Sequence, residues 1–413
     1  MVETLEIDIL NLLLVLSVAW VFGSFSERLG YPALMGELLA GIVFGPPLLG
    51  LIHPAEELTI FAELGVFLLM IYVGMEVDIR DLLELGPQSF IVAVGGFVLP
   101  FGLGYAAGLL IGATVDQALF VGLAMAATSL ATKSRILVDL DLLDTRIAGV
   151  LLGGALVSDV GVLVVFAGVI GFIQAGAVNP VSIATIAGKA LAFFAIALLI
   201  GVRFLPLVWR QLESLRERYG FVDKTSAFTI ALLVALLFAE LAHLAGLHMI
   251  IGGFMAGLFL RQADLEPGLY DHMYGVMYDL AIGFFAPIFF VTVAFELTLD
   301  VFANDVGLLA LLVTVAFVGK IVGSWSFSLP TDLTSREGLV VGFGMNGRGT
   351  VEIILASIGL DAGIIDQQLF SILVFLAMLT TALVPITMKW GVDWLEAVGE
   401  LVRMDEAADV GEA

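Results

Sequence analysis

A single carboxylate lies deep inside a long apolar segment of this chain. Asp159 follows Ser158 in the stretch GGALVSDVGVLVVF, which belongs to an apolar run over residues 147–173. At about 1.5 Å per residue, a helix of that length crosses a bilayer and carries Asp159 near its middle. An ionisable group at that depth costs about 2.5 to 3.5 kcal/mol on insertion scales. Asp159 is therefore either paired inside a helix bundle or part of an ion pathway.

Two other apolar segments are interrupted by small and polar residues. AMAATSLATKSRIL contains Thr128 and Ser129, and GFGMNGRGTVEIIL contains residues 346–350 with glycines at 347 and 349. Glycine weakens a helix, and Ser, Thr and Asn side chains offer the backbone other hydrogen bonds, so we expect both helices to unwind here. Freed carbonyls could coordinate a cation. Packing of small residues between helices would explain the glycines, but not Asn346 and Arg348.

The composition is that of a membrane protein. Hydrophobic residues make up 60% of the 413 residues and charged residues 14%, with a mean hydropathy of +1.09, which excludes a soluble globular protein. Cysteine is absent, which excludes disulfides and thiolate metal sites. The net charge of −23 argues against nucleic-acid binding and suggests a high-salt environment, such as that of a halophilic organism. No nucleophile–base pair, metal cluster or phosphate loop indicates an enzyme or a bound cofactor.

The apolar runs predict an all-α polytopic membrane protein with thirteen transmembrane helices. We find no cleavable signal peptide, since the first residues are acidic, and expect a transporter domain over 1–392 followed by a short acidic cytoplasmic tail over 393–413. The predicted limits of the spans are 7–27, 33–52, 58–78, 89–112, 117–137, 146–173, 182–209, 224–243, 247–262, 274–298, 302–328, 336–360 and 367–392.

The basic residues predict how the chain is oriented. Fourteen of the seventeen fall at alternate ends of the thirteen spans, which places the N-terminus outside and the C-terminus in the cytoplasm of a multi-pass protein in the cell membrane. The fourteen are Arg28, Arg80, Lys133, Arg135, Arg146, Arg203, Arg210, Arg216, Arg218, Lys224, Arg261, Arg336, Lys389 and Arg403.

Three basic residues, Lys189, Lys320 and Arg348, lie within the predicted spans instead. Lys189 is within two turns of an outer end, from which it can reach the interface. Lys320 and Arg348 are deeper, and Asp159 and Glu352 are the embedded acids that could balance them. The i, i+4 spacing of Arg348 and Glu352 favours a structural ion pair, with direct ion contact as the alternative. Lys320 either compensates a helix dipole or carries a proton.

The two halves of the chain resemble each other. MGELLAGIVFG at 35–45 matches IGGFMAGLFLR at 251–261, and YVGMEVDIRDL at 72–82 matches FVTVAFELTLD at 290–300. These matches pair spans of opposite direction, which predicts an inverted-topology repeat whose discontinuous helices meet at mid-membrane. The first repeat covers about 7–173, a linker helix about 182–209 and the second repeat about 224–392.

In these motifs the chain resembles the monovalent cation:proton antiporter-2 family, the sodium/proton and potassium/proton exchangers. The motifs run from about residue 22 to 390 and include GELLAGIVFGPPLLGLI, AELGVFLLMIYVGMEVD, AATSLATKSRIL, LLDTRIAGVLLGGALVSDVGVLV and GFGMNGRGTVEIILASIGL. The resemblance implies a core domain of helices at about 89–173 and 302–392, in which the two discontinuous helices cross. The remaining helices would form the interface of a homodimer. It also implies a membrane domain without the regulatory nucleotide-binding domain of some members.

The resemblance further implies roles for site residues. Asp159 matches the family's ion-binding aspartate, but Ser158 stands where many electrogenic members carry a second aspartate. Lys320 matches the basic residue that pairs with that acid in some members, so its partner here is open, as is the charge moved per cycle. Asn346 is expected to serve the unwound region.

We therefore expect exchange of Na⁺ or another monovalent cation for H⁺, by competition at Asp159 and with alternating access of the site to the two sides. Deprotonated Asp159 would bind Na⁺ with help from Ser158, Thr128, Ser129 and backbone carbonyls, and the protonated acid would return the proton. The alternatives are a potassium/proton antiporter, a sodium-coupled organic-anion symporter of related fold, and a gated channel.

The other acids and the histidines fit structural or interfacial roles better, with pH sensing by a histidine as an alternative. They are Glu76, Glu240, Glu296, His53, His243, His248 and His272.

Overall fold

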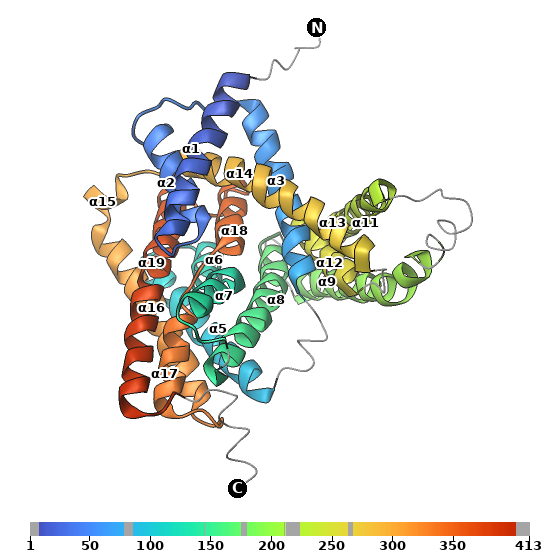
Figure 1. Cartoon of the computed structure of the whole chain (residues 1–413). Coiled ribbons are helices and arrows are strands. Elements are labelled where there is room, and N and C mark those ends of the chain that lie inside the picture. Colours follow the sequence, from blue (N-terminus) through green and yellow to red (C-terminus); the bar gives the residue numbers. More distant parts are fainter. Residues whose placement is uncertain are drawn as a thin grey trace. The chain divides into compact units, whose positions relative to one another are not determined.

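The computed structural model describes residues 8–77, 86–143, 145–174, 180–209, 211, 224–262 and 267–401. The described part is all-helical (Figure 1). Nine of its helical stretches are long and apolar enough to cross a membrane, and three shorter apolar helices accompany them. Several residues used for the orientation argument lie outside these ranges, as does the chain from 402 onward. Those residues are Arg80, Arg210, Arg216, Arg218 and Arg403.

The chain divides into two compact units. The first contains 1–19, 51–80 and 166–292, and the second contains 20–50, 81–165 and 293–413. Helices α1 (Ile9–Arg28) and α8 (Arg146–Gln174) run from one unit into the other. The first unit holds α3 (Glu56–Glu76), α9 (Pro180–Leu199), η1 (Ile200–Phe204), α11 (Lys224–Leu244), α12 (Met249–Gln262), α13 (Pro267–Leu280), η2 (Ala281–Phe285) and most of α14 (Ala286–Val293).

The second unit, called the core unit below, carries every candidate site residue. Its helices are α2 (Ala33–Phe44), α5 (Pro87–Leu110), α6 (Val115–Ala126), α7 (Leu130–Asp139), η3 (Ala294–Glu296), α15 (Val301–Asn304), α16 (Val306–Ser328), α17 (Ser335–Gly344), α18 (Thr350–Asp361) and α19 (Gln367–Val398). Within it, α5 packs on α6 and α16, and α17, α18 and α16 pack on α19.

Helices occupy all of the predicted apolar segments, but some ends differ. The segment 33–52 is helical only to Phe44, because Pro46 and Pro47 follow and cannot continue a helix. The segment 302–328 holds the short α15 before α16 begins at Val306. The last helix continues past residue 392 to Val398 and ends at Gly399, whose φ of 69° is left-handed.

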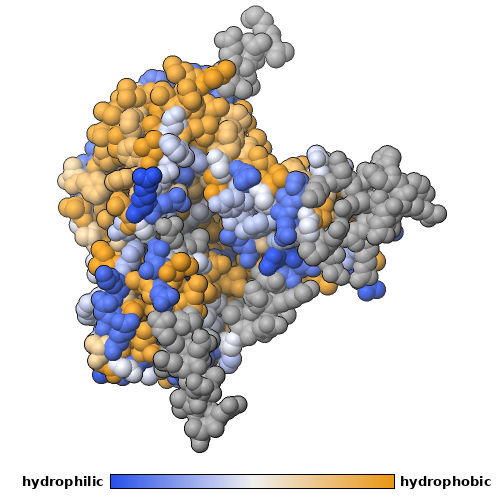
Figure 2. All heavy atoms as spheres, viewed as in Figure 1, coloured by the Kyte–Doolittle hydropathy of each residue, from blue (hydrophilic) through white to orange (hydrophobic). Residues whose placement is uncertain are grey.

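The outward-facing side chains are largely apolar. Figure 2 shows broad hydrophobic areas on the visible face. Large apolar side chains are exposed on α1 and α11, among them Trp20 at 73% and Leu233 at 60%. Exposed apolar surface on this scale is expected of a protein that lies in lipid.

Both interrupted helices are found where the sequence predicts them. Helix α6 ends at Ala126 and α7 begins at Leu130, and α17 ends at Gly344 while α18 begins at Thr350. Ser129 caps α7, since its Oγ accepts from Thr132 N at 3.4 Å. Gly349 precedes α18, and a Cβ there would lie 2.6 Å from Ser129 Oγ, so only glycine fits beside the other break.

Helices α5 and α16 cross through two glycines that face each other. A Cβ on Gly95 would lie 2.5 Å from Gly323 O, and one on Gly323 would lie 2.3 Å from Gly95 O. Neither distance is tolerable for a real Cβ atom. The crossing therefore depends on the absence of both side chains, and it sets how closely the helices around the two breaks can pack.

We expect Gly95→Ala and Gly323→Ala each to destabilise the core unit by about 1 to 3 kcal/mol, because overpacking forces the two backbones apart. Thermal unfolding of the detergent-solubilised protein measures this. Gly102→Ala on the same helix is the control, since nothing lies within 4 Å of a Cβ there. Unchanged melting of both variants would contradict the close-contact argument.

Candidate functional site

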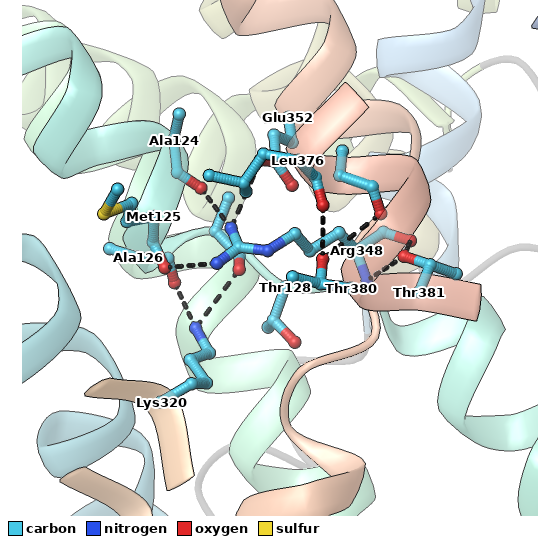
Figure 3. Close-up of polar contacts among 12 residues, drawn as sticks. Ala124, Met125, Ala126, Thr128, Lys320, Arg348, Glu352, Leu376, Thr380 and Thr381 are labelled. Atoms are coloured by element: carbon cyan, nitrogen blue, oxygen red, sulfur yellow. Dashed lines mark hydrogen bonds and ion pairs between the residues drawn. The ribbon is translucent and has the colours of Figure 1, made fainter. Parts of the chain in front are cut away.

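Two buried basic side chains neutralise the carboxyl end of α6. Lys320 on α16 is fully buried and Arg348, from the break between α17 and α18, is 1% exposed. Together they donate to four consecutive backbone carbonyls (Figure 3). The distance from Arg348 Nη2 to Met125 O is 3.0 Å, and that from Lys320 Nζ to Ala127 O is 3.1 Å. The acceptors are the carbonyl oxygens of Ala124, Met125, Ala126 and Ala127.

These contacts answer a specific physical need. The last four carbonyls of a helix have no partner within the helix and carry the negative end of its dipole. In α6 that end is buried, where an unsatisfied carbonyl is costly. The Lys320 ammonium thus lies where it can compensate the helix dipole, which is one of the two roles expected for it; the other is to carry a proton.

The expected ion pair between Arg348 and Glu352 is present. Arg348 Nη1 lies 3.2 Å from Glu352 Oε1, and both side chains are almost completely buried. The Arg348 guanidinium thus donates both to the carbonyls at the end of α6 and to Glu352 in the first turn of α18. Since charge-assisted contacts inside a protein are strong, Arg348 holds the two breaks together.

The two breaks also satisfy each other's backbone. Thr128 Oγ1 lies 3.1 Å from both Met345 O and Gly347 O, and Ser129 N donates to Gly347 O at 2.9 Å. Thr132 Oγ1 donates to Arg348 O at 3.3 Å. The sequence predicts that Thr128 is a cation ligand. In this structure its hydroxyl already donates to the carbonyls of the second break.

Lys133 is a site residue that the sequence reasoning missed. The sequence places it at the cytoplasmic end of its span, whereas in the structure Lys133 on α7 is only 1% exposed and contacts the first break. Its Nζ donates to Thr128 Oγ1 and, at 3.0 Å, to Ser129 O. It also interacts electrostatically with Asp159. The available signal was its position inside the predicted span 117–137, four residues after Ser129.

Asp159 and Ser158 lie on α8, which packs along the second break. Asp159 is 6% exposed and Ser158 2%. Asp159 interacts electrostatically with Lys320 as well as with Lys133. The core unit thus assembles three cations and two acids from both halves of the chain, namely Lys133, Lys320, Arg348, Asp159 and Glu352.

This arrangement suits a monovalent cation better than a resident metal. Within the described ranges, no group of three or more His, Asp and Glu side chains could hold a metal ion. The site contains two carboxylates, Asp159 and the Glu352 that pairs with Arg348, and the two breaks add hydroxyl and carbonyl oxygens. Hard oxygen ligands with low total charge are appropriate for an alkali ion.

The remaining predicted acids lie elsewhere. Glu76, at the end of α3, accepts a 2.5 Å hydrogen bond from Tyr72, and Glu240 on α11 is 3.9 Å from His243. The backbone oxygen of Glu296 accepts from Gln367. These contacts are structural in character.

Among the histidines, His53 belongs to a backbone link with Asn11. His248, in the turn between α11 and α12, has its pKa lowered by burial. A lowered pKa favours the neutral imidazole at neutral pH.

Comparison with known proteins decides the class. Residues 12–394 match the family described as "Sodium/hydrogen exchanger, transmembrane". The chain belongs to this family. It is a multi-pass cation/proton antiporter and not an enzyme, which also removes the symporter and channel alternatives.

Individual relatives agree with this assignment. The antiporter is 33% identical to the Na(+)/H(+)-K(+) antiporter GerN of Bacillus cereus, over 89% of this chain and 92% of that protein. It is 28% identical to a Na(+)/H(+) antiporter of Enterococcus hirae, over 93% and 98% of the two chains. The sodium proton antiporter MjNhaP1 from Methanocaldococcus jannaschii shares the fold, with a TM-score of 0.68, 18% identity and coverage of 94% and 96%.

The contacts of Arg348 predict an unequal effect of removing the two partners of its ion pair. We expect Arg348→Gln to destabilise the antiporter by about 3 to 5 kcal/mol, since it leaves a buried acid uncompensated and two carbonyls without donors. Glu352→Gln should cost less, because Arg348 keeps its carbonyl acceptors. Thermal unfolding and a double-mutant cycle measure the difference, and a larger loss for Glu352→Gln would contradict the assignment.

Proposed function

We propose that the antiporter exchanges Na⁺ for H⁺ by competition at the Asp159 carboxylate. The observation that carries this proposal is the burial of Asp159 at the two helix breaks, beside cations that stabilise its charged form. The deprotonated carboxylate binds the cation, with Ser158 beside it, and the protonated carboxyl returns the proton. Thr128 keeps one oxygen lone pair beyond its present contacts, so it stays in the ligand proposal, and Ser129 contributes through its backbone oxygen.

We also propose that the fold is an inverted repeat with thirteen spans. Paired helix caps support it: Thr114 and Thr334 form capping boxes at α6 and α17, 220 residues apart. Thr145 and Asp366 cap α8 and α19 by accepting from the backbone three residues on. These pairs fall at the spacing expected of two copies of one unit.

Glycine contacts in the matching motifs support the same repeat. A Cβ on Gly36 would lie 2.1 Å from Phe22 O, and one on Gly252 would lie 2.3 Å from Phe238 O. Gly36 and Gly252 are 216 residues apart, and so are Phe22 and Phe238. The matching motifs at 35–45 and 251–261 have the same separation. Equivalent contacts at equivalent positions are unlikely to arise in unrelated segments.

The transport cycle in this proposal uses alternating access. The core helices at about 89–173 and 302–392 move against the other helices, which form the interface of a homodimer in the lipid bilayer. The N-terminus is outside and the C-terminus cytoplasmic, as the basic residues indicate. Asp159 would then be exposed to each side in turn.

Potassium is the second candidate cation. GerN, the 33% identical relative, is named as a Na(+)/H(+)-K(+) antiporter. Applied to this chain, that name makes K⁺ an alternative substrate at the same carboxylate. Separate titrations with NaCl, KCl and LiCl in proteoliposomes rank the cations.

The first test is loss of exchange in Asp159→Asn. An amide cannot cycle between a proton and a cation, so cation-driven dissipation of ΔpH in proteoliposomes should fall to the level of empty liposomes. Asp300→Asn is the control, because that aspartate is exposed and lies outside the long helices. Normal exchange by Asp159→Asn would contradict the proposal.

Competition also fixes the direction of the pH dependence. Lowering the pH protonates the carboxylate, so the half-saturating Na⁺ concentration should rise with falling pH. The limiting slope is about tenfold per pH unit for one proton displaced by one cation. Fluorescence assays over a pH series measure it, and a half-saturating concentration that does not depend on pH excludes competition at one group.

The response to voltage tests the stoichiometry. In this proposal Lys320 and Lys133, which donate to fixed oxygen acceptors, keep the same charge throughout the cycle. We therefore expect one cation to exchange for one proton without net charge movement. A potassium/valinomycin clamp should change the initial rate by less than about twofold, whereas a strong acceleration would indicate that a lysine loses its proton in each cycle.

A further inference from the structure

Three buried oxygens near the second break lack hydrogen-bond partners among the described residues. They belong to Ser158, Ser324 and Asn346, whose side chains are 2%, 0% and 0% exposed. A buried acceptor without a partner costs about 1 to 3 kcal/mol. Each such oxygen needs a hydrogen-bond donor or a bound ligand as a partner.

The register of α8 brings Ser158 to the second break. The Leu151 side chain would meet a Cβ on Gly344 at 2.8 Å, and a Cβ on Gly154 would lie 3.6 Å from Met345 Sδ. Ser158 is one turn beyond Gly154 on the same helix face. It therefore continues the line of contacts along the break, toward the residue after Met345.

Ser324 reaches the same region from α16. A Cβ on Gly96 would lie 2.7 Å from Ser324 Oγ and 3.3 Å from Met345 Cε. Met345 therefore lies against both Gly96 and Gly154, which places Ser324 on one side of this methionine and the turn of α8 before Ser158 on the other. Ser324 is also one turn from Lys320, which interacts electrostatically with Asp159.

The amide of Asn346 has one end fixed. Its Nδ2 donates to Gly342 O at 3.0 Å, which leaves Oδ1 as the buried acceptor. This differs from Ser129, whose Oγ already interacts with Thr132. Asn346 thus contacts the end of α17 through Nδ2 and leaves Oδ1 for a ligand.

We propose that Ser158, Ser324 and Asn346 supply neutral oxygen ligands to the monovalent cation carried by Asp159. This inference rests on the proposed exchange at Asp159 and names the residues that set cation affinity and selectivity. Hydroxyl and amide oxygens replace part of the hydration shell of an alkali ion. With one carboxylate and two lysines nearby, the site disfavours a divalent cation, which is usually bound by several acids.

The test uses single variants of the full chain in proteoliposomes and in detergent. Ser158→Ala, Ser324→Ala and Asn346→Ala should each raise the half-saturating Na⁺ concentration about tenfold, since each removes one contact to a charged ligand. They should also reduce the rise in melting temperature caused by NaCl and alter the order of Na⁺, Li⁺ and K⁺. Melting without Na⁺ should change little for the two serine variants.

Ser328→Ala is the matched control on α16. Ser328 is as buried as Ser324, but its Oγ donates to Trp325 O at 2.7 Å, so half-saturation by Na⁺ should stay within about twofold of the wild type. If Asn346→Ala does not fold, the two serine variants, which lose only a hydroxyl, decide the question.

Any folded variant of the three with wild-type half-saturation and wild-type cation order overturns the proposed ligand set. That result is distinct from failure of the exchange proposal, which would show as normal transport by Asp159→Asn.

Discussion

Helix α6 ends inside the core unit, and its four terminal carbonyls must be neutralised there. The donors, Lys320 and Arg348, come from positions 193 to 224 residues further along the chain. Without them the buried end of the helix would carry both unsatisfied acceptors and an uncompensated dipole. The break after α6, beside which the proposed cation site lies, is thus stable only because the second half of the chain supplies two basic side chains to the first.

The charges of this region also bear on what the exchanger can carry. With all five side chains ionised, three cations face two acids, a balance of +1. In the proposed cycle, adding either a proton or a monovalent cation to Asp159 raises this to +2. The two loaded states would then have the same charge, so the surrounding protein need not distinguish them electrostatically.

Features of short range were predictable from the sequence. The apolar setting of Asp159, the small and polar residues at both breaks, and the i, i+4 spacing of Arg348 and Glu352 all follow from neighbouring residues. These predictions need only helix geometry and the cost of burying charge.

Features that depend on long-range packing were not predictable. Lys133 was counted with the cytoplasmic residues because a basic residue near a span end usually lies there. Its burial depends on where α7 packs. Similarly, Thr128 has the oxygen expected of a ligand, but only the structure shows that carbonyls of the second break and Lys133 engage it. Residue type identifies possible partners, and packing selects among them.

The paired caps of α8 and α19 have a consequence for the symmetry of ion binding. Asp159 lies 14 residues after Thr145, and the residue 14 after Asp366 is Thr380. Thr380 is fully buried and its hydroxyl donates to Leu376 O of its own helix at 2.8 Å. If the two halves are copies of one unit, as proposed above, they differ at this position: one has an acid where the other has a hydroxyl that donates to its own backbone. In the proposed repeat, the cation site therefore draws its carboxylate from one copy alone, and the counterpart helix offers a hydroxyl in its place.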